Sequence, residues 1–186
     1  MGRKIVCILA ILGIYMLVHA EPSEADIKLA AESEKYCAST ESTKATPEMI
    51  MQKVNEAADI ISKEGAACFR KFKGKNSKFI FAGTYMWIND MNGVMLMHPI
   101  KPGMESQNLI GLKDSNGKRF FVDMITVCQN KGEGWVDYMW PKPGEKDRSL
   151  KVSFVKKTIC DGKVVVVGCG VYDMTLEQIS AAMQKK

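Results

Sequence analysis

Histidine is almost absent from this chain. Only two occur among its 186 residues, His19 and His98, and no Gly-x-Ser-x-Gly segment is present, although hydrolases often carry their nucleophile on such a segment. Catalysis by a cysteine–histidine pair needs the two side chains within hydrogen-bond reach, and nothing in the sequence places a cysteine beside His98. These absences argue against an enzyme, and we expect no catalytic residues.

Dense positive charge and the usual cysteine motifs of metal sites are missing as well. No run of lysine or arginine is longer than two residues, whereas a nucleic-acid-binding domain needs a basic patch or stripe. No two cysteines have the Cys-x-x-Cys spacing of zinc sites or haem attachment sites. The sequence therefore predicts no nucleic-acid partner, no metal and no cofactor.

Only one long apolar run is present, at residues 5–18 after Arg3 and Lys4. Its length is short of the roughly 20 residues that span a bilayer, and a small-residue cleavage site ending in Ala20 follows it, as in a secretory signal peptide. We expect cleavage after Ala20, a periplasmic or secreted location, and no membrane span in the mature chain. Without Arg3 and Lys4 the 26 basic residues become 24 against 21 acidic ones, a net charge of +3.

An odd number of cysteines remains after residue 20, so at least one thiol is free or pairs between chains. A tight turn at Asp161-Gly162 would place Cys169 opposite Phe154, which disfavours a bridge from Cys169 to Cys160. Other pairings stay open, and burial as small apolar side chains is the alternative for most of them. The five cysteines are Cys37, Cys68, Cys128, Cys160 and Cys169.

The first third of the mature chain reads mostly as helix. Residues 24–38 are weakly helical with a poor apolar stripe, and the polar residues 39–46 read as a linker. Thr46 and Pro47 are typical of an N-cap and a first helical position. The apolar residues that follow recur at helical spacing and predict one buried stripe. They are Ile50, Val54, Ala57, Ala58 and Ile61.

From residue 78 onward the pattern favours strands. Residues 79–90 and 94–100 read as two strands around a turn at Gly93. The loop 101–117 is too long to be idle in a compact domain, and apolar residues at helical spacing predict a short helix that ends at Gly132.

Three more strands and a helix complete the chain. Residues 134–142 read as a strand, and 150–159 with 163–173 form a hairpin about the strong turn pair Asp161-Gly162. Thr175 and Gln178 form a capping box that opens a C-terminal helix. This order predicts an α+β domain in which a long N-terminal helix packs on a five-stranded antiparallel sheet.

Several segments together resemble a known family, the type 2 single Cache domain, which is the PAS-like extracellular sensor module of bacterial chemoreceptors and histidine kinases. The resemblance covers about residues 46–172. It implies a sheet with one face on the long helix and a pocket for a small organic ligand, commonly a short carboxylate, on the other. The segments are YMWINDMNGVMLMHPIKPG (85–103), LKDSNGKRFF (112–121), GEGWVDYMWPKPGE (132–145), KVSFVKK (151–157) and VVGCGVY (166–172).

The resemblance suggests a division of the chain. Residues 1–20 would be the signal peptide, 21–45 an N-terminal extension and linker, 46–172 the Cache domain, and 173–186 the C-terminal helix. Receptors of this family have membrane spans that flank the domain, whereas this chain looks like a free-standing Cache domain.

Two aromatic pairs are candidates for the pocket. Tyr85 and Trp87 share one strand face, as do Tyr138 and Trp140, by the period of two along a strand. Tyrosine and tryptophan combine a large apolar area with an OH or NH group that can orient a ligand. Packing in the core is the alternative role for all four.

Three polar side chains are candidate ligand donors. His98 lies at a strand end, Lys142 follows another strand, and Lys156 lies two residues after Phe154 on one strand face; each can donate to a carboxylate. Structural hydrogen bonding is the alternative for the histidine, and a solvated surface for the lysines. The predicted ligand-binding residues are thus Tyr85, Trp87, His98, Tyr138, Trp140, Lys142 and Lys156.

Two departures from the family pattern bear on the ligand. Phe154 stands where the family usually has a tyrosine, which removes a phenolic OH that would otherwise be available to a ligand. The aliphatic stretch 159–168 replaces a segment that usually contains tryptophan.

Two functions follow from these features. The first is a soluble, exported Cache domain that binds a small organic ligand for sensing or signalling and presents it to a membrane-bound receptor or kinase. The alternative is a ligand-free interaction or adaptor protein that acts through its surface or a free thiol.

Overall fold

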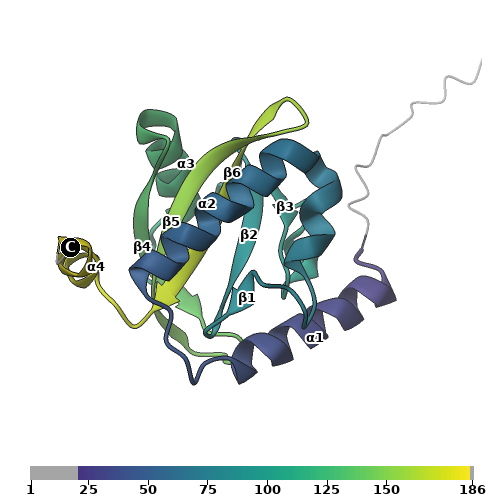
Figure 1. Ribbon diagram of the computed structural model, residues 1–186, viewed down its shortest axis with the longest axis horizontal. Helices are drawn as coiled ribbons and strands as arrows, with labels where there is room; N and C mark the ends of the chain where they lie inside the picture. Colours follow the sequence, from purple (N-terminus) through teal and green to yellow (C-terminus); the bar gives the residue numbers. More distant parts are fainter. Residues whose placement is uncertain (1–20, 185–186) are drawn as a thin grey trace, which may run out of the picture.

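The structure is a computed structural model that describes residues 21–184, so the expected signal peptide at 1–20 lies outside the described residues. Figure 1 shows helices packed around one sheet. The α-helices are α1 (Glu24–Ser39), α2 (Pro47–Glu64), α3 (Phe120–Lys131) and α4 (Leu176–Gln184), with 3-10 helices η1 (Gly65–Phe72) and η2 (Pro102–Met104). The strands are β1 (Ile80–Phe81), β2 (Thr84–Asp90), β3 (Met95–Met97), β4 (Glu133–Pro141), β5 (Arg148–Cys160) and β6 (Lys163–Tyr172).

The sheet is antiparallel, with strand order β1-β2-β6-β5-β4 and with β3 paired to β2. The predicted α+β class is confirmed, but the sheet has six strands where five were expected. The difference arises at Ala82 and Gly83, whose φ angles of 48° and 72° belong to the left-handed region and break an extended strand. The predicted strand 79–90 is therefore divided into β1 and β2.

The β5–β6 hairpin has the register that the sequence predicted. Cys160 pairs with Lys163, and Phe154 pairs with Cys169. The two turn residues Asp161 and Gly162 have φ angles of 49° and 77°, the signature of a two-residue turn that matches the twist of its strands.

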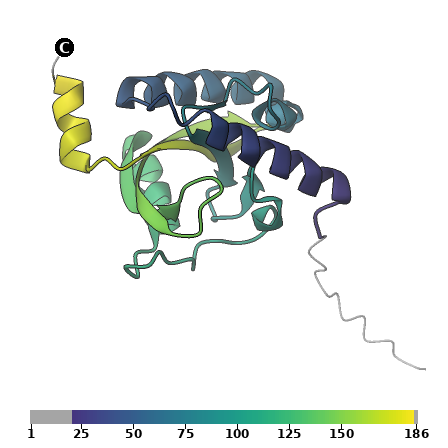
Figure 2. The same cartoon turned by 90° about the horizontal axis from the view of Figure 1, so that it is seen from below.

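Helix α2 lies across one face of the sheet (Figures 1 and 2). The hydroxyl of Thr46 accepts a hydrogen bond from the amide of Met49, which confirms the predicted N-cap. The predicted stripe is buried, and it packs against the side chains of β5 and β6 that point toward this face. This contact forms the larger part of the core.

The opposite face of the sheet is covered by α3 and by the segment between β3 and α3 (Figure 2). A second core cluster forms here around residues such as Tyr85, Phe120 and Tyr138. Helix α1 packs against β1, β2 and η2 at the side of the sheet. It is a complete helix capped by Ser23, although its sequence reads as only weakly helical.

The remaining features concern the C-terminus and the surface. The capping box is confirmed, because Thr175 and Gln178 exchange hydrogen bonds at the start of α4.

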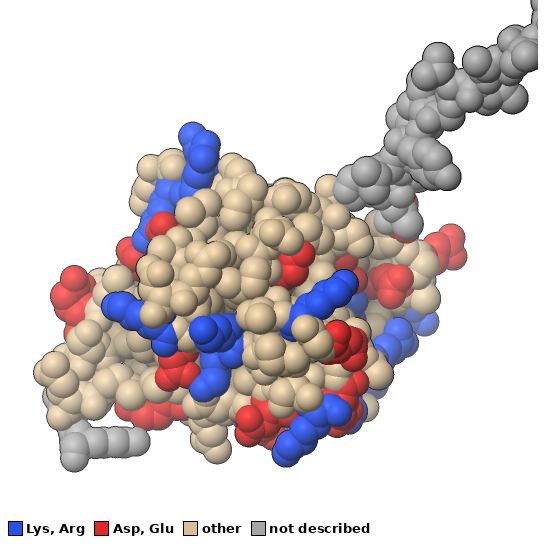
Figure 3. Space-filling view, turned by 90° about the horizontal axis from the view of Figure 1, so that it is seen from above, with Lys and Arg blue, Asp and Glu red and all other residues tan. Residues whose placement is uncertain are grey.

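Among the described residues no helix is long and apolar enough to cross a membrane. On the face that Figure 3 shows, basic and acidic side chains alternate around a broad region of other residues, a pattern typical of a solvated surface.

Candidate ligand pocket

A small cavity lies on the sheet face opposite α2, and five of the seven predicted ligand-binding residues line it. They reach it from β2, from β4 and from the segment after β3, because residues two apart on a strand share one face. The other walls come from β3, η2 and α3. The lining residues are Tyr85, Trp87, His98, Tyr138 and Trp140, with Met95, Met104, Phe120 and Phe121.

The cavity is narrow. Its volume is about 10 Å³, which is enough for about one water molecule. A ligand with several heavy atoms would therefore require the cavity walls to move outward.

The aromatic wall is fixed by stacking and by internal hydrogen bonds. Phe120 stacks on Tyr138 with ring centroids 4.5 Å apart and an interplanar angle of 5°. The indole NH of Trp140 donates to the hydroxyl of Tyr85 at 3.0 Å, and the hydroxyl of Tyr138 lies 3.0 Å from Ser153 Oγ. The polar tips of these three residues are thus partnered within the protein.

His98 is a neutral hydrogen-bond donor in this cavity. Its Nδ1 atom accepts the amide hydrogens of Ile100 at 3.3 Å and Lys101 at 3.0 Å, so the ring proton resides on Nε2. Burial, followed by the charge of nearby Lys151, lowers the pKa of His98 well below its ordinary value. The imidazole is therefore uncharged at neutral pH.

Lys151 on β5 is a site residue that the sequence reasoning missed. Its side chain is fully buried, and its Nζ atom lies 4.2 Å from the ring centroid of Tyr85, 4.6 Å from that of Tyr172 and 5.4 Å from that of Trp87. Among the described residues Nζ has no hydrogen-bond partner. Burial lowers the pKa of Lys151 from 10.5 to about 8. Aromatic faces stabilise such an ammonium group but accept no hydrogen bond from it in the way that an oxygen does.

Trp87 contributes a second donor of the same kind. Its indole Nε1 is buried and, within residues 21–184, also lacks a hydrogen-bond partner. Buried polar groups without partners are rare in folded proteins. An ammonium group and an indole NH that both lack an acceptor, next to one cavity, form a site suited to an anionic oxygen ligand.

Two glycines of β6 shape this site. A Cβ atom on Gly168 would lie 2.4 Å from Cζ2 of Trp87, and one on Gly170 would lie 2.6 Å from Cε of Lys151. The Gly-Cys-Gly segment therefore leaves the space into which the two unpartnered donors fit.

The structure does not bring Lys142 and Lys156 to this cavity. Lys142 Nζ lies 2.7 Å from Asp173 and 3.6 Å from Glu41, in a separate hollow of about 390 Å³ at the end of β6. Lys156 forms an ion pair of 2.5 Å with Glu133, and it lies an odd number of positions from Lys151, hence on the other face of β5. Both lysines already have acidic partners.

Phe154 also lies on the α2 side of the sheet. Its ring packs against Trp135 with centroids 5.2 Å apart, within the core cluster that contains α2. The expectation that a hydroxyl at this position would be available to the pocket ligand is therefore wrong, because odd and even positions of β5 face opposite sides.

No group of three or more potential ligands that could hold a metal ion is found among the described residues. All five cysteines of this part of the chain are free and buried.

Most of the chain matches a known protein family. Residues 34–184 match the family model described as "Single Cache domain 2". The methyl-accepting chemotaxis protein McpP of Pseudomonas putida is 35% identical over 88 residues, which are 47% of this chain and 16% of that receptor. The chain thus spans only a small part of the length of this curated relative.

Two solved structures share the fold over most of the chain. A periplasmic sensor domain of a chemotaxis protein is 29% identical with a TM-score of 0.50, over 81% of this chain and 92% of that one. The second is a Cache chemosensory domain whose description concerns carboxylic acid recognition. It is 30% identical with a TM-score of 0.52, over 82% of this chain and all of that one. From its match to the family model, supported by this likeness in structure, the chain belongs to the single Cache domain 2 family of sensor domains.

Proposed function

We propose that this protein is an exported Cache sensor domain that binds a short monocarboxylate, such as acetate or propionate, in the cavity described above. The observation that carries this proposal is the buried ammonium group of Lys151, which has no acceptor among the described residues and lies against two rings of the cavity wall. A buried charge without a partner is costly. A bound carboxylate would supply the missing partner.

The cavity explains the class of ligand. One carboxylate oxygen would accept from Lys151 Nζ and the other from the free NH of Trp87, with the Nε2 proton of His98 as a third donor. The apolar tail would rest against Phe120 and Met104, which line the cavity. His98 is neutral, and Lys101 Nζ lies 5.8 Å from the ring centroid of Trp140, whereas Lys151 is the positive group that is fully buried beside the cavity. We therefore propose a ligand with one carboxylate, because a second buried carboxylate would lack such a partner.

The comparisons support the proposal at two points. A structural relative with 30% identity is a Cache domain described as recognising a carboxylic acid. The chemotaxis receptor of Pseudomonas putida contains a segment similar to this chain, which supports a role in sensing. We propose a membrane-bound receptor or kinase as the partner that reads the bound state.

The division of the chain belongs to the same proposal. Residues 1–20 have the composition of a signal peptide, and their removal would leave the mature chain in the periplasm or outside the cell. Residues 21–45 would form an extension that includes α1, residues 46–172 the Cache domain, and residues 173–186 the C-terminal helix.

Calorimetric titration of the mature protein with acetate, propionate, succinate and methylammonium tests the function. We expect binding of the two monocarboxylates, weak or no binding of succinate, and none of methylammonium. Lys151→Met removes a charge-assisted hydrogen bond of about 1.5–3 kcal/mol, so propionate affinity should fall about 10- to 100-fold. The matched control Lys156→Met removes a lysine on the other face of β5 and should bind like the wild type.

Absence of binding by every carboxylate would contradict the proposal. That outcome would favour the alternative of an interaction protein without a ligand, for which the narrowness of the cavity, about 10 Å³, is the supporting observation.

A further inference from the structure

The segment between His98 and Ser106 closes one side of the cavity. His98 and Met104 from this segment are part of the wall. Since the cavity has room for only about one water molecule, a ligand cannot enter unless part of the wall moves. This segment, the cavity loop, contains η2.

The C-terminal end of the cavity loop is held by backbone hydrogen bonds to β3. After it, Ser106 donates its amide to the carbonyl of Met95 at 2.8 Å, and Met95 donates to the carbonyl of Gln107 at 3.0 Å. These bonds fix the chain beyond the loop to β3. Ser106 itself has a φ angle of 65°, a value that few residues other than glycine adopt. Ser106 therefore marks the end of the loop that is held to the sheet.

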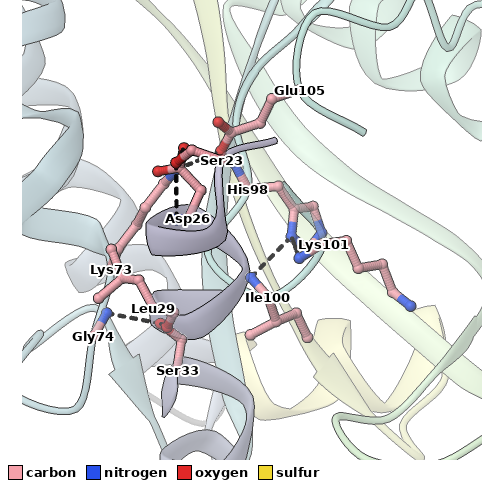
Figure 4. Close-up of polar contacts among 10 residues, drawn as sticks. All are labelled: Ser23, Asp26, Leu29, Ser33, Lys73, Gly74, His98, Ile100, Lys101 and Glu105. Atoms are coloured by element: carbon pink, nitrogen blue, oxygen red, sulfur yellow. Dashed lines mark hydrogen bonds and ion pairs between the residues drawn. The ribbon is translucent and has the colours of Figure 1, made fainter. Parts of the chain in front are cut away.

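Glu105 holds the cavity loop in place through its side chain. Its Oε1 atom accepts the backbone amide of His98 at 2.7 Å and lies 2.6 Å from Nζ of Lys73 (Figure 4). The side chains of Lys73 and Glu105 are only 13% and 25% exposed. Water screens such a pair less than a surface ion pair, whose contribution is small.

Lys73 lies where the chain leaves η1 and meets helix α1. The amide of the next residue, Gly74, donates to Oγ of Ser33 at 2.7 Å, and Ser33 is fully buried on α1. A hydrogen bond from Ser23 lowers the pKa of Asp26 in the first turn of α1, and the charge of Lys73 lowers it further. Figure 4 shows Lys73 reaching toward Asp26 and Glu105 together.

We propose that the Lys73–Glu105 ion pair is a latch that holds the cavity loop closed and couples cavity occupancy to helix α1. Glu105 acts as a positioning residue, because it contacts the backbone of His98 and is not among the residues that line the cavity. Opening the loop separates Glu105 from Lys73 and leaves Lys73 to Asp26 of α1. The coupling to occupancy rests on the proposed function, whereas the latch itself does not.

Hydrogen exchange followed by mass spectrometry tests the latch without any ligand. Glu105→Gln keeps an oxygen that can accept from His98 but loses the ion pair, and Lys73→Met removes the other partner. In both variants we expect peptides of residues 98–105 to exchange about fivefold faster than in the wild type, as for an ion pair at the upper end of the measured range.

The matched control is Glu133→Gln, which breaks the ion pair with Lys156 on the other face of β5 and should leave loop exchange unchanged. Exchange in Glu105→Gln and Lys73→Met equal to the wild type would overturn the latch. Faster exchange over the whole chain, with a lowered melting temperature, would also overturn it, because the pair would then only stabilise the fold.

Stopped-flow tryptophan fluorescence with propionate tests the coupling, since two of the three tryptophans, Trp87 and Trp140, line the cavity. Latch variants should bind and release propionate about fivefold faster, with a smaller change in the dissociation constant. In the wild type propionate should change the exchange of the first turn of α1, and in Glu105→Gln it should not. Propionate that binds without changing α1 overturns the coupling, while a wild type that binds no carboxylate overturns the proposed function and leaves the exchange test of the latch standing.

Discussion

Lys151 is the residue on which the account of the pocket depends. Its ammonium group is surrounded by the rings of Tyr85, Trp87 and Tyr172, and burial lowers its pKa to about 8. Cation–π contacts offset part of the cost of burying this charge. The remainder should reduce the stability of the fold, as expected if this group serves the proposed ligand binding instead of folding.

Substitution of this lysine should separate stability from binding. We predict that Lys151→Met leaves the free energy of unfolding in urea unchanged or raises it, because a buried unpaired charge is replaced by an apolar side chain of similar length. The same variant should lose propionate affinity in calorimetry. A marked loss of stability would indicate that the ammonium group serves the fold.

Ligand affinity should fall as the pH rises through about 8. The carboxylate pairs with the ammonium form of Lys151, and above a pKa of about 8 binding must first return a proton to the amine. The dissociation constant for propionate should then increase about tenfold per pH unit. Calorimetry between pH 7 and pH 9.5 measures this change, and in Lys151→Met the dependence should be absent.

The free energy of unfolding of the unliganded protein should change with pH in the opposite direction to the ligand affinity. The pKa of Lys151 is about 8 in the fold against an ordinary value of 10.5, so between these values the unfolded chain holds a proton that the folded chain has released. The contribution of this group to the free energy of unfolding therefore rises with pH in that window. Comparison of urea unfolding for the wild type and Lys151→Met isolates it, and equal pH dependence in both would contradict the lowered pKa.

The sequence predicts the four aromatic residues that line the cavity, but not the buried charge of Lys151. A period of two places Tyr85 with Trp87 and Tyr138 with Trp140, and the cavity contains all four. The same period cannot say which face of β5 points to the cavity. Lysines are almost never fully buried without a partner, so a strand lysine is first read as solvated.

Strand β6 brings the donors of the site together at the scale of elements. Gly168 and Gly170 of this strand lie beneath Trp87 and Lys151. Cys169 between them points to the other face and packs on the α2 side. The close backbone approach that two strand glycines permit is what lets these large side chains lie flat against the sheet.

Gly168→Ala should therefore disturb both binding and stability. The new Cβ atom would lie 2.4 Å from the indole of Trp87, so the ring must shift, at a cost of about 1–3 kcal/mol. Urea unfolding and propionate titration measure the two effects. Gly111→Ala is the matched control, because a Cβ atom there meets nothing within 4 Å, and equal behaviour of the two variants would show that the contact with Trp87 is unimportant.

At the scale of the whole molecule the cysteines are part of the core. Burial raises the pKa of Cys37 and Cys128 to about 12 and that of Cys68 and Cys169 to about 11. These thiols stay protonated near neutral pH and are poor nucleophiles. Burial, which was the expected role for most of the cysteines, is confirmed for all five in the described chain.

The native mature protein should thus react slowly with an aromatic disulfide reagent. We predict that all five thiols react only once the chain is unfolded in guanidinium chloride, as followed by absorbance. Rapid reaction of one thiol in the native protein would support the adaptor alternative, which acts through a free thiol.

Much of the fold follows from local sequence. The cap at Thr46, the turn at Asp161-Gly162 and the capping box at Thr175 are encoded within a few residues, and each is found in the structure. The break at Ala82-Gly83 and the stability of α1 also involve contacts between distant residues. The amide of Gly83 donates to Oγ1 of Thr40, and the amide of Gly74 donates to Oγ of Ser33 on α1. The acidic partners of Lys142 and Lys156 come from other segments of the chain, so the local sequence around each lysine does not predict these ion pairs.

Lysine-selective NMR of the mature protein can show whether a carboxylate ligand reaches the ammonium group of Lys151. With ¹³C at the ε-carbon of lysine, one resonance that is absent in Lys151→Met should titrate near pH 8 in the unliganded protein. Saturation with propionate should move that titration to higher pH, because a bound carboxylate stabilises the ammonium form. A Lys151 resonance that titrates identically with and without propionate would show that the ligand does not reach this lysine and would contradict the proposed pocket.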